Sequence, residues 1–316
     1  MKPRFGVSAL GVAAALVGCR HSPPPPPNPA ATPSASAAAP APGSGSCGAV
    51  SCRRFPTATA AFAEVLARDP RVLGVGESHA QKGSEAIEPA TRRFTRDLLP
   101  LLQGRASDLV IELMLPNPKC KRETKAAAKE QKVVTEHQAP TDQNDYVALG
   151  ARAKELGIRP HALEPTCDDL AKIASGGEAA VATSLDVVTR LVTELATKLA
   201  REQAASPAPK MVVLYGGSLH DDVSPRPGRE QWSFGPALVK LTGGRYVELD
   251  LVVPEFIGDS PAWRSLPWVP GFSRSSVAKE AALLEPVPSG LVLVFPCGKP
   301  AADVQVRGFI GGGGCE

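Results

Sequence analysis

The sequence predicts an α/β fold in which helices cover both faces of a mostly parallel sheet, giving three layers in a single domain. Short apolar runs alternate with stretches whose apolar residues recur at helical spacing, which favours this class. The run at 109–115 (LVIELML) is apolar except for Glu112, as is typical of a strand covered on both faces. The chain has 316 residues, of which 43% are hydrophobic, so it can build a sizeable core.

The order of the elements follows from these patterns. Strands are predicted at residues 71–75, 109–115, 158–163, 211–215, 245–253 and 291–295. Helices are predicted at 57–69, 84–101, 119–136, 145–156, 183–204 and 234–241. Ser84 is placed to cap the second helix, and Pro100 weakens its end. The proline-rich stretch 254–288 is interpreted as a long irregular connection.

The first 18 residues have the pattern of a secretory signal peptide. Lys2 and Arg4 precede an apolar run from residue 5 to residue 17, which is too short to cross a bilayer. The run ends in Leu-Val-Gly-Cys19, which resembles a bacterial lipobox; an ordinary secretory signal with a chance cysteine is the alternative. We therefore expect a lipoprotein of the cell envelope, anchored to the membrane through lipidated Cys19. Arg20 in place of aspartate favours the outer membrane.

A tether and a neutral domain follow. Residues 19–46 are rich in proline and alanine and predict a semi-extended spacer ahead of a domain at 47–316. Lys2, Arg4 and Arg20 account for the whole formal net charge of +3, because the first 46 residues contain no Asp or Glu. The domain is therefore formally neutral, and the chain is only 5% aromatic. This composition argues against a nucleic-acid partner.

The chain has seven cysteines. If Cys19 carries lipid, an even number remains, and in an exported protein this predicts disulfide bonds. The pairings we expect are Cys47–Cys52, Cys120–Cys167 and Cys297–Cys315. The first closes a short loop, the second joins segments that follow two predicted strands, and the third ties the chain end to the last strand. Other connectivities stay open.

Polar side chains gather where several predicted strands end. Glu77, Ser78 and His79 follow the first strand, Glu112 lies inside the second, Glu164 follows the third, and His220 and Asp222 follow the fourth. Ligands of parallel α/β sheets bind outside the carboxyl ends of the strands, so these residues are predicted to share a site.

Each of these residues also has a structural interpretation. His79 and His220 could be capping or core histidines, and Glu164 could belong to a turn. A buried Glu112 needs a partner, either a metal ion or an arginine such as Arg92 or Arg93. His161, inside the third strand, is expected to be structural.

Two copies of a Gly-x-x-His motif, Gly76-Glu-Ser-His79 and Gly217-Ser-Leu-His220, flank Glu112. This arrangement resembles the superfamily of ChaN-type haem-uptake lipoproteins, Tiki-type metalloproteases, TraB-like proteins and erythromycin esterases, and it is most similar to the ChaN and Tiki branches. The resemblance covers about residues 70–255. It implies a three-layer fold with His79, Glu112 and His220 as site positions and Glu77 beside them. It implies no single activity, because the superfamily includes both haem binders and hydrolases.

Three functions compete on these residues. In a metal-dependent hydrolase, His79, His220 and Glu112 would hold a divalent cation (Zn, Mn, Co or Fe), and Glu77 or Glu112 would act as general base. In the alternative, the protein is a non-catalytic lipoprotein for uptake of haem or iron. A serine hydrolase using Ser78 is the third possibility, although Ala80 replaces the last glycine of the nucleophile elbow. The ligand would be a small molecule, haem or a peptide.

Overall fold

The computed structural model describes residues 43–47, 50–258, 261–269, 272 and 279–298. These residues belong to one compact unit, Pro40–Glu316. The predicted signal peptide, Cys19 and residues 20–42 of the tether lie outside them. Within the described ranges, no helix has the length and apolar character needed to cross a membrane.

The centre of the domain is a nine-stranded sheet of order β1-β2-β8-β9-β7-β3-β6-β4-β5. Its strands are β1 (Gly43–Cys47), β2 (Val50–Phe55), β3 (Val72–Glu77), β4 (Ala106–Met114), β5 (Arg159–Leu163), β6 (Met211–Gly217), β7 (Tyr246–Val252), β8 (Ala281–Val287) and β9 (Gly290–Val294). The neighbours from β9 to β5 pair in parallel, whereas β8, β2 and β1 extend one side of the sheet in antiparallel pairings. The predicted mostly parallel sheet is confirmed.

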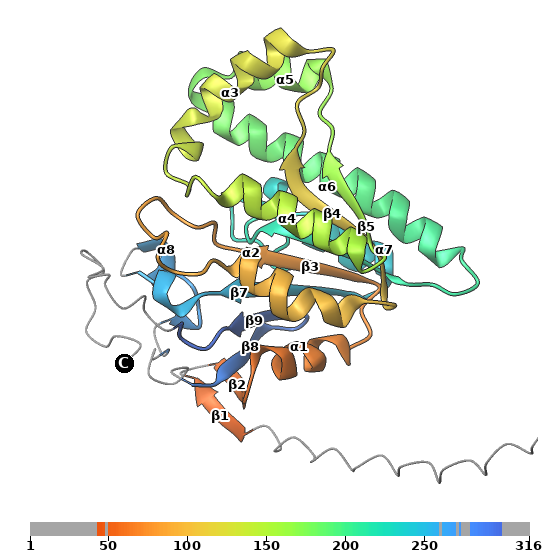
Figure 1. Cartoon of the computed structure of the whole chain (residues 1–316), viewed down its shortest axis with the longest axis vertical. Coiled ribbons are helices and arrows are strands. Elements are labelled where there is room, and N and C mark those ends of the chain that lie inside the picture. Colours follow the sequence, from red (N-terminus) through yellow and green to blue (C-terminus); the bar gives the residue numbers. More distant parts are fainter. Residues whose placement is uncertain (1–42, 48–49, 259–260, 270–271, 273–278, 299–316) are drawn as a thin grey trace, which may run out of the picture. The chain divides into compact units, whose positions relative to one another are not determined.

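Helices cover both faces of the sheet (Figure 1). They are α1 (Ala58–Leu66), α2 (Ala90–Arg93), α3 (Lys121–Thr135), α4 (Asp142–Glu155), α5 (Cys167–Ala174), α6 (Ala180–Ala204), α7 (Gly235–Thr242) and α8 (Pro261–Arg264). A π-helical turn at Phe94–Leu98 and a 3-10 turn at Leu99–Leu102 continue α2. Short 3-10 turns also lie at Gly177–Ala179, Glu230–Trp232 and Pro254–Phe256.

Two apolar cores follow from the alternation of side chains along the strands. On β6, Val213 and Tyr215 enter the core beneath α1, the α2 segment and α4. Val212 and Leu214, on the opposite face of the same strand, pack with α6 and α7. Because both faces of the strand are covered, its run is apolar throughout. The three predicted layers are therefore confirmed.

The second helix begins later than predicted. It starts at Ala90 rather than at Ser84, whose hydroxyl donates to the Gln81 carbonyl at 2.5 Å instead of capping a helix. Glu88 precedes Pro89, and a residue before proline is disfavoured in helical conformation. Helix α5 was not predicted, although the Thr166 and Asp169 side chains form a capping box at its start.

The interpretation of 254–288 as wholly irregular is wrong, because β8 lies within it and pairs antiparallel with β9. The two strands are joined by a tight turn in which Ser289 has a φ of 65°. Strands β1 and β2 were also not predicted, and β1 begins at Gly43, inside the segment expected to be tether. Its sequence, GSGSC, has no apolar alternation, so its strand structure comes from pairing with β2.

The predicted disulfide Cys120–Cys167 is confirmed; it joins the start of α3 to α5 across a sequence separation of 47. Cys120 is fully buried in a small core with α3, α5 and α6. Cys52 and Cys297 are disulfide-bonded as well. The structure does not describe their predicted partners, the Cys47 side chain and Cys315. The pairings Cys47–Cys52 and Cys297–Cys315 therefore stay predictions.

We expect the double substitution Cys120→Ala and Cys167→Ala to lower the free energy of unfolding by about 2–4 kcal/mol, because the bond constrains a long loop of the unfolded chain. Denaturant unfolding of the variant and the wild type would measure the change. A single-cysteine variant, Cys167→Ala, should show a similar loss. An unchanged midpoint would contradict a stabilising role of the bond.

Candidate functional site

The carboxyl ends of β3, β4 and β6 lie side by side, and the predicted residues Glu77 and Glu112 are at the ends of the first two. His79 and Glu112 line a cavity of about 550 Å³. Its remaining walls come mainly from α3, α4, α5, α6 and the segments that follow β4 and β5. The cavity is thus placed where parallel α/β sheets hold their ligands.

The buried carboxylate of Glu77 accepts hydrogen bonds from three hydroxyl groups. Its Oε2 atom accepts from the Thr91 hydroxyl at 2.7 Å and from the Tyr215 hydroxyl at 2.8 Å. Its Oε1 atom accepts from the Tyr146 hydroxyl at 2.9 Å and lies 3.3 Å from Nδ1 of His79. Because both oxygens are engaged, Glu77 is suited to orient His79 rather than to act as a base.

The electrostatic environment of His79 favours the charged imidazolium. Burial lowers its pKa, but the hydrogen bond and the negative charge of Glu77 act in the opposite direction, as do the charges of Glu112 and Asp142. Together these effects raise the pKa of His79 to about 9. His79 is therefore protonated at neutral pH in the absence of a ligand.

Two glycines of β6, Gly216 and Gly217, leave space for the side chains of His79 and Glu112. A Cβ atom on Gly217 would lie 3.2 Å from His79 Nε2 and 3.7 Å from Glu112 Oε2, between the two side chains. A Cβ atom on Gly216 would come within 2.3 Å of Glu112 Oε2. The backbone N–H of Gly217 donates to that same oxygen at 2.7 Å. The Gly-Gly pair at the end of β6 therefore lets Glu112 approach the backbone closely.

His220 contacts Glu112 from the other side. The ring is 3% exposed, and its Nδ1 donates to the Trp232 carbonyl at 2.8 Å, with the Thr189 hydroxyl 3.0 Å from the same nitrogen. A carbonyl oxygen only accepts, so this contact assigns the ring proton to Nδ1. Nε2 of His220 is then the atom that faces Glu112 Oε1, at 3.6 Å.

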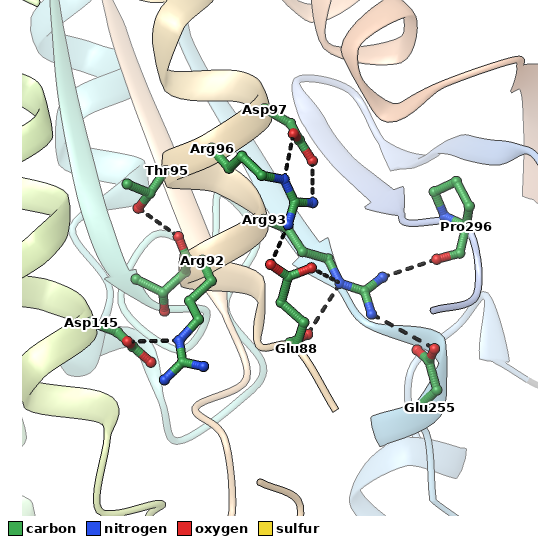
Figure 2. A network of polar contacts seen from close by, with 10 residues as sticks. Glu88, Arg92, Arg93, Thr95, Arg96, Asp97, Asp145, Glu255 and Pro296 are labelled. Atoms are coloured by element: carbon green, nitrogen blue, oxygen red, sulfur yellow. Dashed lines mark hydrogen bonds and ion pairs between the residues drawn. The ribbon is translucent and has the colours of Figure 1, made fainter. Parts of the chain in front are cut away.

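The alternative in which Glu112 pairs with Arg92 or Arg93 is not found, because both arginines have other partners. Arg92 donates to Asp145 on α4 at 2.8 Å, and Arg93 pairs with Glu88 and Glu255, as Figure 2 shows. Both arginines belong to α2, and their partners lie on α4 and in the segments before α2 and after β7, not at the end of β4.

These arginines fix α2 in place. Arg93 is 5% exposed, and it donates to the Pro296 carbonyl at 2.9 Å beyond β9, while Arg92 ties α2 to α4 (Figure 2). The same helix carries Thr91, which donates to Glu77. The network in Figure 2 therefore helps to hold α2, and with it Thr91, in position.

The donor types at the site, two imidazoles and a carboxylate, suit a divalent cation. In both histidines Nδ1 is engaged, which leaves Nε2 as the atom that a metal ion would use; Nε2 of His220 lies 3.6 Å from Glu112 Oε1. Yet no group of three or more His, Cys, Asp or Glu side chains is placed to hold a metal ion, as far as the described residues go. His79 contacts Tyr146 of α4, whereas His220 packs against α6. The predicted metal centre stays a prediction.

The other predicted site residues do not join His79. Glu164 is exposed after β5. Ser78 and Asp222 line a different cavity. No hydrogen bond links Ser78 to a histidine in the part of the chain that is described. His161, expected to be structural, lies 2.8 Å from the buried carboxylate of Asp108.

Sequence reasoning missed the side chains that surround His79: Thr91, Tyr146, Tyr215 and Asp142. Tyr215 ends a predicted strand, so its place at the carboxyl edge of the sheet could have been noticed. Asp142 lines the cavity, and its Oδ2 atom is buried without a hydrogen-bond partner. Burial raises the pKa of Asp142 to about 6, against the opposing charge of His79.

No protein-family model matches the chain, and no curated protein matches it. Two solved structures are similar. One is the type III effector HopBA1, with a TM-score of 0.37 and 11% identity over 73% of this chain and 90% of the other. The second is a Bacillus cereus protein, with a TM-score of 0.37 and 10% identity over 76% of this chain and 93% of the other. The similarity to the ChaN and Tiki branches stays a prediction.

We expect Glu77→Gln to lower the pKa of His79 by about two units or more, because burial then acts without the opposing carboxylate. An NMR titration of the histidine rings would measure this shift. Glu164→Gln, which removes an exposed carboxylate after β5, is the control and should leave His79 unchanged. The same His79 pKa in both variants would show that Glu77 does not control it.

Proposed function

We propose that this protein is a hydrolase whose reaction takes place between Glu112 and His79. One observation carries the proposal: His79, oriented by a buried Glu77, lies next to Glu112 at a cavity of about 550 Å³. A cationic imidazole beside a carboxylate supplies an acid and a base in one place.

In this proposal the two groups have separate tasks. Glu112 is the general base that takes a proton from the attacking water, and the Gly217 N–H keeps its carboxylate oriented. The His79 imidazolium stabilises the negative charge that develops on the substrate and donates a proton to the leaving group. His220 is not among the described residues that line the cavity of His79 and Glu112. Its Nε2 atom lies 3.6 Å from Glu112 Oε1, and its task is to position that carboxylate.

The cavity walls indicate the kind of substrate. Leu115 and Val147 are large apolar side chains that are 45% and 60% exposed, and both line the cavity. None of the described lining residues is a lysine or an arginine. The proposed substrate is therefore an uncharged ester or amide with an apolar group that covers these side chains.

We place this activity at the cell envelope, on the strength of the sequence. Residues 1–18 have the pattern of a signal peptide, and Cys19 follows a lipobox-like run. A lipid on Cys19 and the proline-rich tether would hold the domain near the outer membrane. The confirmed Cys120–Cys167 disulfide suits an oxidising compartment outside the cytoplasm.

The test is hydrolysis of p-nitrophenyl esters of increasing acyl length by the purified full-length chain, with and without a chelator. Activity that survives the chelator and rises with acyl length supports the proposal. Metal bound at one equivalent and lost in a His79→Ala/His220→Ala variant, with chelator-sensitive activity, would replace it by the metal-dependent version. A Soret band on haem titration without hydrolysis would favour the uptake lipoprotein. Labelling of Ser78 by a fluorophosphonate would favour the serine hydrolase.

A further inference from the structure

Strand β7 carries acidic residues on a face that a central strand normally fills with apolar ones. Val247, Leu249 and Leu251 enter the apolar core beneath α1, the α2 segment and α4. Glu248 and Asp250 alternate with them and point to the opposite face, between the neighbouring strands β3 and β9. Asp221, from the loop after β6, joins the two carboxylates there: a Cβ atom on Gly76 would lie 2.5 Å from Asp250 Oδ1 and 2.7 Å from Asp221 Oδ1.

These carboxylates have few partners. Asp221 is 2% exposed, and neither of its side-chain oxygens has a hydrogen bond; Oδ1 of Asp250 is buried and unpartnered as well. Glu248 accepts from the Val223 N–H at 2.6 Å. No ion pair between described residues includes any of the three. Ionised carboxylates buried without a positive partner are costly, so without a ligand these groups retain protons, which an incoming cation can replace.

The acidic face opens into a cavity. Glu248 and Asp250 line a space of about 390 Å³, within the range of small-ligand sites, and Asp222 lies on the same wall. Trp263 and Trp268 also line it, with ring centroids 6.4 Å apart at an interplanar angle of 81°. This cavity shares no described lining residue with the cavity of His79 and Glu112.

We propose that this second cavity is a binding site for a ligand with an organic ammonium group, which Glu248 and Asp250 receive beside the two tryptophans. An ammonium group donates hydrogen bonds to carboxylates and is attracted to tryptophan faces. A metal ion fits less well, since no described group of three acidic, His or Cys side chains is placed to bind one. Arg226 and Arg229 also line the cavity and would face an anionic end of the same ligand.

Binding in this site is coupled to proton release. Burial, together with the charges of Asp250 and Asp222, raises the pKa of Glu248 to about 9, although the Val223 N–H opposes this rise. Burial and the charge of Asp222 raise the pKa of Asp250 to about 7. At neutral pH Glu248 is therefore a carboxylic acid. When the ammonium binds, the Glu248 O–H bond breaks, its proton goes to the buffer, and a carboxylate–ammonium pair forms.

The test is calorimetric titration of the full-length chain with n-butylammonium at pH 7, beside n-butanol, butyrate and 4-aminobutyrate as probes of the same chain length. We expect n-butylammonium to bind at least about tenfold more tightly than n-butanol or butyrate. The binding heat should depend on the ionisation enthalpy of the buffer, because a proton is released. Tighter binding of 4-aminobutyrate than of n-butylammonium would identify Arg226 and Arg229 as receivers of the anionic end, and the reverse order would identify a simple ammonium site.

Two isosteric variants test the residues. Glu248→Gln and Asp250→Asn should each weaken n-butylammonium binding at least about tenfold, and Glu248→Gln should also reduce the buffer dependence. Glu285→Gln, which removes a carboxylate on strand β8, beyond β9, that pairs with Arg68, is the control and should bind like the wild type. Ester hydrolysis should be unchanged in all three, so a failure here is distinct from a failure of the proposed hydrolase. Equal binding of n-butanol and n-butylammonium, or no heat with any amine at millimolar concentration, would overturn the proposal.

Discussion

Glu112→Gln is expected to reduce kcat for ester hydrolysis by about 10²–10⁴-fold, because a general base typically contributes a rate factor of this size. The amide oxygen of the new side chain can still accept the Gly217 N–H that Glu112 Oε2 accepts at 2.7 Å. The packing of β4 against β6 is therefore preserved, and the variant should unfold within a few degrees of the wild type. What the glutamine lacks is the capacity to take a proton from water.

The measurement pairs kcat with thermal unfolding of the same samples. Glu164→Gln is the matched control, since it removes a predicted carboxylate that the structure leaves exposed after β5. His79→Gln should reduce kcat as well, because the cationic ring is lost. If Glu112→Gln keeps more than half of the wild-type rate, Glu112 is not the base and the proposed reaction is wrong.

The parallel strands could be predicted because burial on both faces leaves a plain signal. The runs around Val213 and Leu293 are apolar at every position, and both lie in strands flanked by other strands. Strand β8 lacks that signal: Glu285 and Pro286 lie near its end, and it belongs to the antiparallel side of the sheet. Its structure depends on pairing with β2 and β9, which a local pattern does not contain.

The site was predictable to the same extent. Glu77 follows one predicted strand and Glu112 lies within the next, so topology places them near one edge of the sheet. Tyr146 reaches Glu77 from a separation of 69 residues, and nothing in the helical pattern around it indicates that contact. The partners of Arg92 and Arg93 were not predictable for the same reason, because they depend on how α2 lies against α4 and the end of β9.

The stability of the unliganded protein is expected to fall as pH rises, and the acidic cluster on β7 is the main cause. Burial, with the charges of neighbouring carboxylates, raises the pKa of Asp250 from 3.8 to about 7 and that of Glu248 from 4.5 to about 9. The folded state then binds more protons than the unfolded state between these limits. The stabilisation is complete below about pH 4, decreases as pH rises, and is lost by about pH 9. His79, with its pKa raised from 6.5 to about 9, contributes in the same direction at the upper end of that range.

Asp250→Asn separates the cluster from His79. The amide cannot ionise, so the variant should gain on the wild type as pH rises and be more stable by about 2 kcal/mol or more at pH 9, while the two differ little at pH 5. Urea unfolding at intervals between pH 4 and pH 9 would give both curves. Asp97→Asn is the control, because it removes a surface carboxylate that pairs with Arg96. Its curve of unfolding free energy against pH should be parallel to that of the wild type over the same range. If the Asp250→Asn curve is also parallel to the wild type, Asp250 does not change its ionisation on folding, and the buried carboxylates must already be neutralised by a cation that the protein retains.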